Sequence, residues 1–110
     1  MSKKDLRTIT IDFEKMRSDS LNESFIRMFS YWVKKIMGGL LGDFAIPVKI
    51  KGTPSEVKSF VGVLAREKSY IEAYRRHGLD NPNTFHSKSR LRSSVGKFER
   101  ETGLKWPFEH

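Results

Sequence analysis

Cysteine is absent from the 110-residue sequence, and its apolar residues, 37% of the chain, never form a long uninterrupted run. Without cysteine there is no disulfide framework, no thiolate nucleophile and no cysteine-ligated zinc. The richest apolar stretch, residues 25–48, is interrupted by charged residues, so it falls short of the roughly 20 apolar residues that cross a bilayer. No apolar leader follows Met1. We therefore expect no membrane span and a cytoplasmic location.

Motifs of the common enzyme classes are also missing. The sequence contains no G-x-S-x-G, no H-E-x-x-H and no G-x-x-x-x-G-K-[ST]. The glycines within 38–42 follow a predicted helix, whereas a nucleotide-binding loop follows a strand. His77, Asp80 and His86 are near one another in sequence, but no candidate second-shell residue accompanies them. We expect a non-enzymatic protein with no catalytic residues, no metal site and no cofactor.

Acidic residues are fewer than basic ones: the sequence has 13 Asp and Glu residues and 21 Lys and Arg residues, which gives a formal net charge of +8. Aromatic residues make up 12% of the chain, and disordered, highly charged segments contain fewer hydrophobic residues than this sequence does. The length is that of one domain. We expect a flexible N-terminus over 1–6 and a single small domain over 7–110.

The first half of the chain predicts two strands around a helix. Residues 7–14 alternate, with Ile9, Ile11 and Phe13 on one side, which predicts a half-buried strand. Ser20 and Glu23 form a capping box for a helix over about 21–37, which we expect Gly38 and Gly39 to end. Alternation resumes over 44–51 and predicts a second strand, at an edge near Pro47.

The second half predicts two helices. Thr53-Pro54-Ser55-Glu56 combines a cap, a first-turn proline and a closing glutamate, and Gly78 suits the left-handed residue after the helix. A turn over about 79–84 precedes another helix ending at Gly103. We expect a helix-dominated α+β domain with the order β-α-β-α-α and a small two-stranded sheet. The strands are parallel neighbours if the first helix connects them.

Basic residues gather on one side of each of the last two helices. At 100° per residue, Arg90, Ser93, Lys97 and Arg100 fall within about 80° of one another and face away from Leu91, Val95 and Phe98. No acidic residue occurs between His86 and Phe98. Cations and hydroxyls in such a row suit phosphates. The candidate nucleic-acid-binding residues are Lys58, Arg66, Arg76, Lys88, Arg90, Ser93, Lys97 and Arg100.

The favoured function is a small basic module that binds DNA or RNA through phosphates with weak sequence preference. The simplest competing interpretation is a solvated polar face, and an acidic protein or an anionic lipid is a further partner class. Trp106 and Phe108 either close the core or bind a partner. The functional alternative is an assembly or adaptor module of viral or mobile-element origin, using these aromatics and a strand edge. Because two strands are marginal alone, that edge could recruit a second copy and form a homo-oligomer.

Overall fold

The computed structural model describes residues 8–18, 23–42 and 46–109. The expected flexible segment 1–6 lies outside them. The chain divides into two compact units, residues 1–53 (unit 1) and 54–110 (unit 2), which are described separately below. The expectation of one domain over 7–110 stays a prediction.

The expected fold class is confirmed: helices dominate, and two short strands form a parallel sheet. One short helix was not expected, so the order is β-α-α-β-α-α. The elements are β1 (Ile9–Asp12), α1 (Phe13–Ser18), α2 (Glu23–Leu41), β2 (Val48–Lys51), α3 (Pro54–His77) and α4 (Pro82–Thr102).

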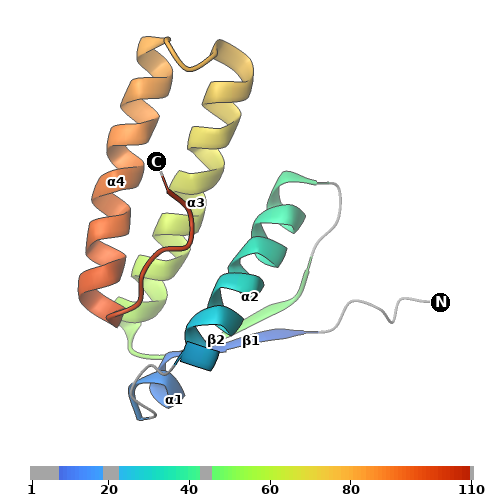
Figure 1. Ribbon diagram of the computed structural model, residues 1–110, viewed down its shortest axis with the longest axis vertical. Coiled ribbons are helices and arrows are strands. Elements are labelled where there is room, and N and C mark those ends of the chain that lie inside the picture. The colour runs from blue at the N-terminus through green and yellow to red at the C-terminus, as the bar shows by residue number, and fades with distance from the viewer. Residues whose placement is uncertain (1–7, 19–22, 43–45, 110) are drawn as a thin grey trace, which may run out of the picture. The chain divides into compact units, whose positions relative to one another are not determined.

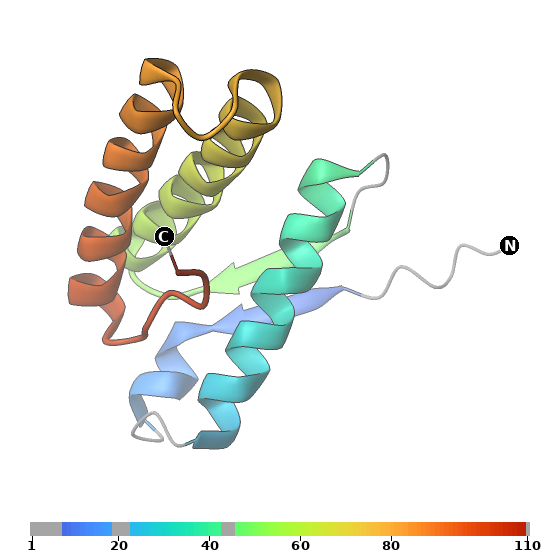
Figure 2. The same ribbon diagram turned by 45° about the horizontal axis from the view of Figure 1, so that its top comes forward.

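The two parallel strands of unit 1 pair Ile9 with Val48 and Ile11 with Ile50. Parallel neighbours need a crossover connection, which the helical segment between the strands supplies. Helix α2 contacts β1 and lies across the strand pair (Figures 1 and 2). Pro47 stands just before β2, and its carbonyl oxygen accepts a 2.9 Å hydrogen bond from the Ile9 amide. At that position the missing N–H of proline removes no ladder bond.

The first strand ends earlier than its alternation predicts. The prediction of a strand through Glu14 was wrong, because α1 begins at Phe13. The Asp12 carboxylate Oδ1 accepts a 3.0 Å hydrogen bond from the Lys15 amide, so Asp12 caps this helix. Phe13 is nevertheless buried, as the alternation predicted.

Helix α2 continues through the glycines that were expected to end it. It extends to Leu41, and the Gly42 amide donates a 3.0 Å hydrogen bond to the Gly38 carbonyl oxygen. A glycine costs a helix about 1 kcal/mol, which the burial of the adjoining Ile36 and Met37 outweighs. The capping residue Ser20 and residues 44–45 of the expected second strand lie outside the described residues. The described strand begins at Val48.

Unit 2 is an antiparallel pair of helices, α3 and α4, with the C-terminal tail running back along them (Figure 1). The C-terminal ends of both helices lie where the sequence predicts, whereas α4 begins at Pro82, inside the turn predicted over about 79–84. Gly78 and Gly103 have φ angles of 84° and 77°, a region that other residues rarely adopt. Asn81 caps α4 by accepting a 2.9 Å hydrogen bond from the Asn83 amide.

An aromatic cluster of Phe60, Phe98 and Trp106 forms the core of unit 2. The ring centroids lie 5.4 to 6.3 Å apart, and Phe60 and Phe98 are fully buried. The Trp106 amide also donates a 2.9 Å hydrogen bond to Oε2 of Glu99 on α4. The tail is therefore fixed to both helices by packing and by a backbone hydrogen bond.

Candidate nucleic acid interface

Four of the predicted binding residues form one exposed row on α4, which we call the α4 stripe. Its buried residues, Thr84, Leu91, Phe98 and Thr102, follow one another at steps of seven, seven and four positions and so lie on one side of the helix. The stripe lies on the opposite side, where each of its side chains is exposed. Its members are Arg90, Ser93, Lys97 and Arg100.

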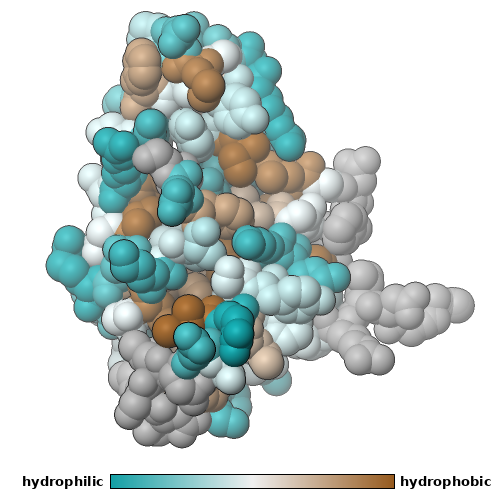
Figure 3. Space-filling model, in the orientation of Figure 1, coloured by the Kyte–Doolittle hydropathy of each residue, from teal (hydrophilic) through white to brown (hydrophobic). Residues whose placement is uncertain are grey.

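The stripe is long enough to contact several phosphates. At 1.5 Å per residue, the ten steps from Arg90 to Arg100 extend about 15 Å along the helix. Phosphates of one duplex strand follow one another at about 3.4 Å along the duplex axis. Figure 3 shows a largely hydrophilic surface over α4, with hydrophobic residues near the end where α3 and α4 join. The stripe therefore presents its cations on a surface that water and ligands can reach.

A glycine within α4 makes room for one of the stripe's guanidinium groups. A Cβ atom added at Gly96 would lie 3.3 Å from Nη1 of Arg100. The Arg100 side chain thus folds back along the helix by one turn. His86 and Ser89 are also exposed on the stripe's side of α4 and were not among the predicted residues. The same 100° spacing places them there.

Lys88 does not belong to the stripe. It is half-buried, and a two-residue step along the helix turns it about 160° away from Arg90. Lys88 was among the predicted binding residues because it lies in the segment without acidic residues, and not because of the direction in which it leaves the helix. Lys88 therefore offers a charge on a different side of α4.

The three predicted cations of α3 are exposed but widely spaced. Lys58 and Arg76 face away from the buried residues of their helix, whereas Arg66 lies at about a right angle to them. At 1.5 Å per residue they extend over about 27 Å. Between them, Lys68 pairs with Glu72 at 3.2 Å, which brings negative charge to this helix. The α3 cations are therefore a sparser arrangement than the α4 stripe.

The geometry of the α3–α4 connection separates it from a helix-turn-helix. The turn predicted over about 79–84 is shorter and begins earlier than expected, because α3 ends at His77 and α4 begins at Pro82. A helix-turn-helix joins its helices at roughly 90–120°. Here they run side by side in opposite directions (Figures 1 and 2). The pair is thus an antiparallel hairpin.

The two predicted partner-binding aromatics differ in exposure. Trp106 is only 6% exposed and its ring packs in the core of unit 2. Phe108 is half-buried, with its ring centroid 6.0 Å from that of Trp106. Of the two roles considered for Trp106, closing the core is the one that this packing favours.

Within residues 8–18, 23–42 and 46–109, no group of three or more histidine, aspartate or glutamate side chains is arranged to hold a metal ion. None of the helices described there combines the length and apolar character needed to cross a membrane.

Comparison with protein-family models, with curated proteins and with solved structures gave no match.

Proposed function

We propose that unit 2 binds nucleic acid, DNA or RNA, through phosphate contacts made mainly by the α4 stripe. The observation that carries the proposal is the exposed row Arg90, Ser93, Lys97 and Arg100, whose first three members lie in a segment without acidic residues from His86 to Phe98 and whose last member lies between Glu99 and Glu101. Lysine and arginine at phosphates release condensed counterions, which favours binding at low salt. The Ser93 hydroxyl adds a hydrogen-bond donor, and a guanidinium can contact two phosphate oxygens at once.

The antiparallel hairpin supports weak sequence preference. Phosphate contacts position a protein on nucleic acid but carry no direct sequence information. Reading bases requires an element that enters a groove, as the second helix of a helix-turn-helix does. The packing of α3 along α4 does not have that arrangement (Figure 1). Binding is therefore expected to depend strongly on salt and weakly on sequence.

A protein-interaction module is the second candidate, and exposed apolar side chains at the end of the hairpin favour it. Leu79 is 60% exposed and Phe85 is 57% exposed. Large exposed apolar side chains of this kind occur at protein interfaces. This candidate predicts that Leu79→Ser with Phe85→Ser abolishes association with a protein partner and leaves the salt dependence of oligonucleotide binding unchanged.

The salt dependence of oligonucleotide binding tests the proposed function. The variant combines Arg90→Gln, Lys97→Gln and Arg100→Gln. Its matched control removes the same charge elsewhere, at the exposed Lys49, Lys51 and Lys105. We expect the slope of log K against log salt to fall by up to about three counterions in the α4 variant. An equal fall in the control would show a response to net charge alone and would remove the stripe from the proposal.

A further inference from the structure

The outward side of α2 carries a second basic surface, in unit 1, which we call the α2 outer face. The helix buries Phe29, Val33, Ile36 and Met37 on its other side. From Ser24 to Leu41 the helix contains no acidic residue. All members of the outer face are exposed, and they are Ser24, Arg27, Met28, Tyr31, Lys34 and Lys35.

An exposed aromatic ring lies among these cations. Tyr31 is 53% exposed, whereas Phe29 is buried and Phe25 and Trp32 are half-buried. Nζ of Lys35 lies 5.7 Å from the Tyr31 ring centroid, and the Trp32 ring centroid lies 5.1 Å away at a tilt of 60°. A cation over a ring is a favourable contact that holds both groups in place. The helix therefore presents a ring and positive charges at one location.

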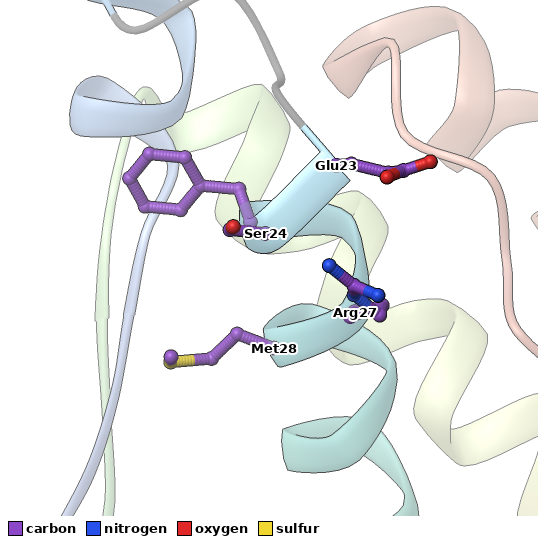
Figure 4. Close-up of a pocket in the computed structure, with 5 residues that line it drawn as sticks. Glu23, Ser24, Arg27 and Met28 are labelled. Carbon is purple, nitrogen blue, oxygen red and sulfur yellow. The ribbon is translucent and has the colours of Figure 1, made fainter.

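Two shallow hollows lie on this side of α2, and the first of them adjoins the Tyr31 ring. One has a volume of about 440 Å³ and is lined by Ser24, Arg27, Met28, Tyr31 and Trp32. A neighbouring hollow of about 480 Å³ shares the first three of these residues (Figure 4). Figure 4 shows the Arg27 and Met28 side chains leaving α2 in different directions, with Glu23, which also lines the second hollow, on the same side as Arg27. Volumes of this size accommodate a small planar ligand.

We infer that the α2 outer face binds single-stranded nucleic acid, with a base stacked at Tyr31 and the adjoining phosphates at Arg27, Lys34 and Lys35. Aromatic rings beside a basic groove are the usual means of holding unpaired strands. A base can reach the ring only when it has left its own stack, so the surface selects single strands over duplexes. This inference shares with the proposed function only the class of ligand, since the α4 stripe belongs to the other unit.

Charge and burial favour this ligand over the other occupants of such a surface. A second copy paired symmetrically through the same face would bring like cations together, which is unfavourable. Insertion into a membrane surface uses the broad apolar side of a helix, and that side of α2 is buried. A single strand supplies negative charge together with flat apolar rings, which matches both components of the face.

The test compares the wild type with Tyr31→Leu, using Tyr31→Phe as the matched control that keeps an aromatic ring. The probes are an oligothymidylate of about 20 nucleotides and a duplex of the same length, because single-strand sites cover about 4 to 16 nucleotides. We expect Tyr31→Leu to weaken single-strand binding about five-fold or more. Tyr31→Phe is expected to bind as the wild type does, and duplex binding is expected to change little in either variant.

A loss that is equal for single strands and duplexes, or no loss at all, would overturn the inference. Tyr31→Leu is also tested for binding to phosphatidylcholine–phosphatidylserine vesicles and for its mass in solution. If vesicle binding weakens, or the mass falls, and single-strand binding is unchanged, the inference is overturned in favour of a lipid or a second copy. Because Tyr31 is exposed, the variants should melt as the wild type does. Lys34→Gln with Lys35→Gln provides a second variant, expected to flatten the salt slope for single strands by about two counterions.

The same measurements separate this inference from the proposed function. If the Arg90, Lys97 and Arg100 variant binds normally while Tyr31→Leu loses single strands, the α4 stripe fails and the α2 outer face stands. If the reverse holds, the stripe stands and the inference is wrong. Absence of binding by the wild type to either probe would overturn both.

Discussion

The indole Nε1 of Trp106 donates a 2.8 Å hydrogen bond to Oε1 of Glu67, which lies 39 positions earlier in the chain. Glu67 is 2% exposed, so its carboxylate is held inside unit 2. Buried carboxylates need hydrogen-bond donors, and the tail supplies one from a side chain that also packs on Phe60 and Phe98. This pair connects the C-terminal tail to α3.

Removing the indole donor should destabilise unit 2 while its aromatic packing remains. Trp106→Phe keeps a ring but leaves Glu67 without this donor, and we expect a loss of about 1–3 kcal/mol in the free energy of unfolding. Urea denaturation followed by circular dichroism measures the loss. Glu67→Gln keeps an acceptor and serves as the control with a smaller effect. A Trp106→Phe variant as stable as the wild type would show that the hydrogen bond contributes little.

Deleting the tail after Gly103 should cost several kcal/mol of stability. Truncation of a buried large aromatic typically costs about 3–5 kcal/mol, and the deletion removes Trp106 together with the buried Leu104. Thermal melting of the full-length and truncated chains gives the comparison. A deletion of residues 109–110 alone is the control and should melt normally. If the longer truncation also melts normally but abolishes association with a partner, the tail is a partner-binding segment instead.

Two glycines with open surroundings should respond to alanine in opposite directions. A Cβ atom would meet nothing within 4 Å at either Gly62 or Gly78. Gly62 lies inside α3, where alanine is favoured by up to about 1 kcal/mol, so Gly62→Ala should raise the melting temperature. Gly78 has a φ of 84°, and Gly78→Ala should lower stability by about 1–2 kcal/mol. Equal effects of the two substitutions would contradict the left-handed conformation at Gly78.

The cap at the start of α1 should contribute measurably to unit 1. Asp12→Ala removes the acceptor for the Lys15 amide and is expected to cost about 1 kcal/mol. Asp12→Ser retains a capping oxygen and should recover most of that loss. Chemical denaturation of the three proteins provides the measurement. An equal loss in both variants would assign the effect to the charge of Asp12 rather than to capping.

Helix ends with strong capping chemistry could be predicted from the sequence alone. Proline fixes φ at Pro54, and Gly78 and Gly103 adopt a left-handed conformation that few other residues tolerate, so local sequence decides these boundaries. The end of β1 could not be predicted in the same way. Alternation places Phe13 on the buried side of a strand, and a helix that begins at Phe13 buries it equally well. The prediction that the helix ends at Gly38 and Gly39 was wrong. Burial of their neighbours favours continuing the helix, and no local sequence pattern reveals that burial.

The same distinction applies to the candidate site, where local helical spacing predicts some features and misses others. The α4 stripe follows directly from helical spacing, so its four residues could be grouped before any coordinates were known. Lys88 was included by its neighbourhood in sequence and lies on another side of the helix. The pairing of Trp106 with Glu67 depends on how the tail returns along the hairpin, and no periodic pattern encodes a contact over such a separation.

The buried residues of α3 all lie between Glu56 and Glu67, whereas its last turns contain none. At that end of the hairpin the Thr84 hydroxyl donates a 2.7 Å hydrogen bond to the Gly78 carbonyl oxygen, beside two large exposed apolar side chains. Elements with few buried apolar contacts open at lower free energy than the core. Amide hydrogen exchange should therefore be fastest near the α3–α4 turn and slowest around Phe98. Along the α4 stripe, Arg90 adjoins the buried Leu91 and Lys97 adjoins the buried Phe98, so the stripe stands on the part of the hairpin that opens last.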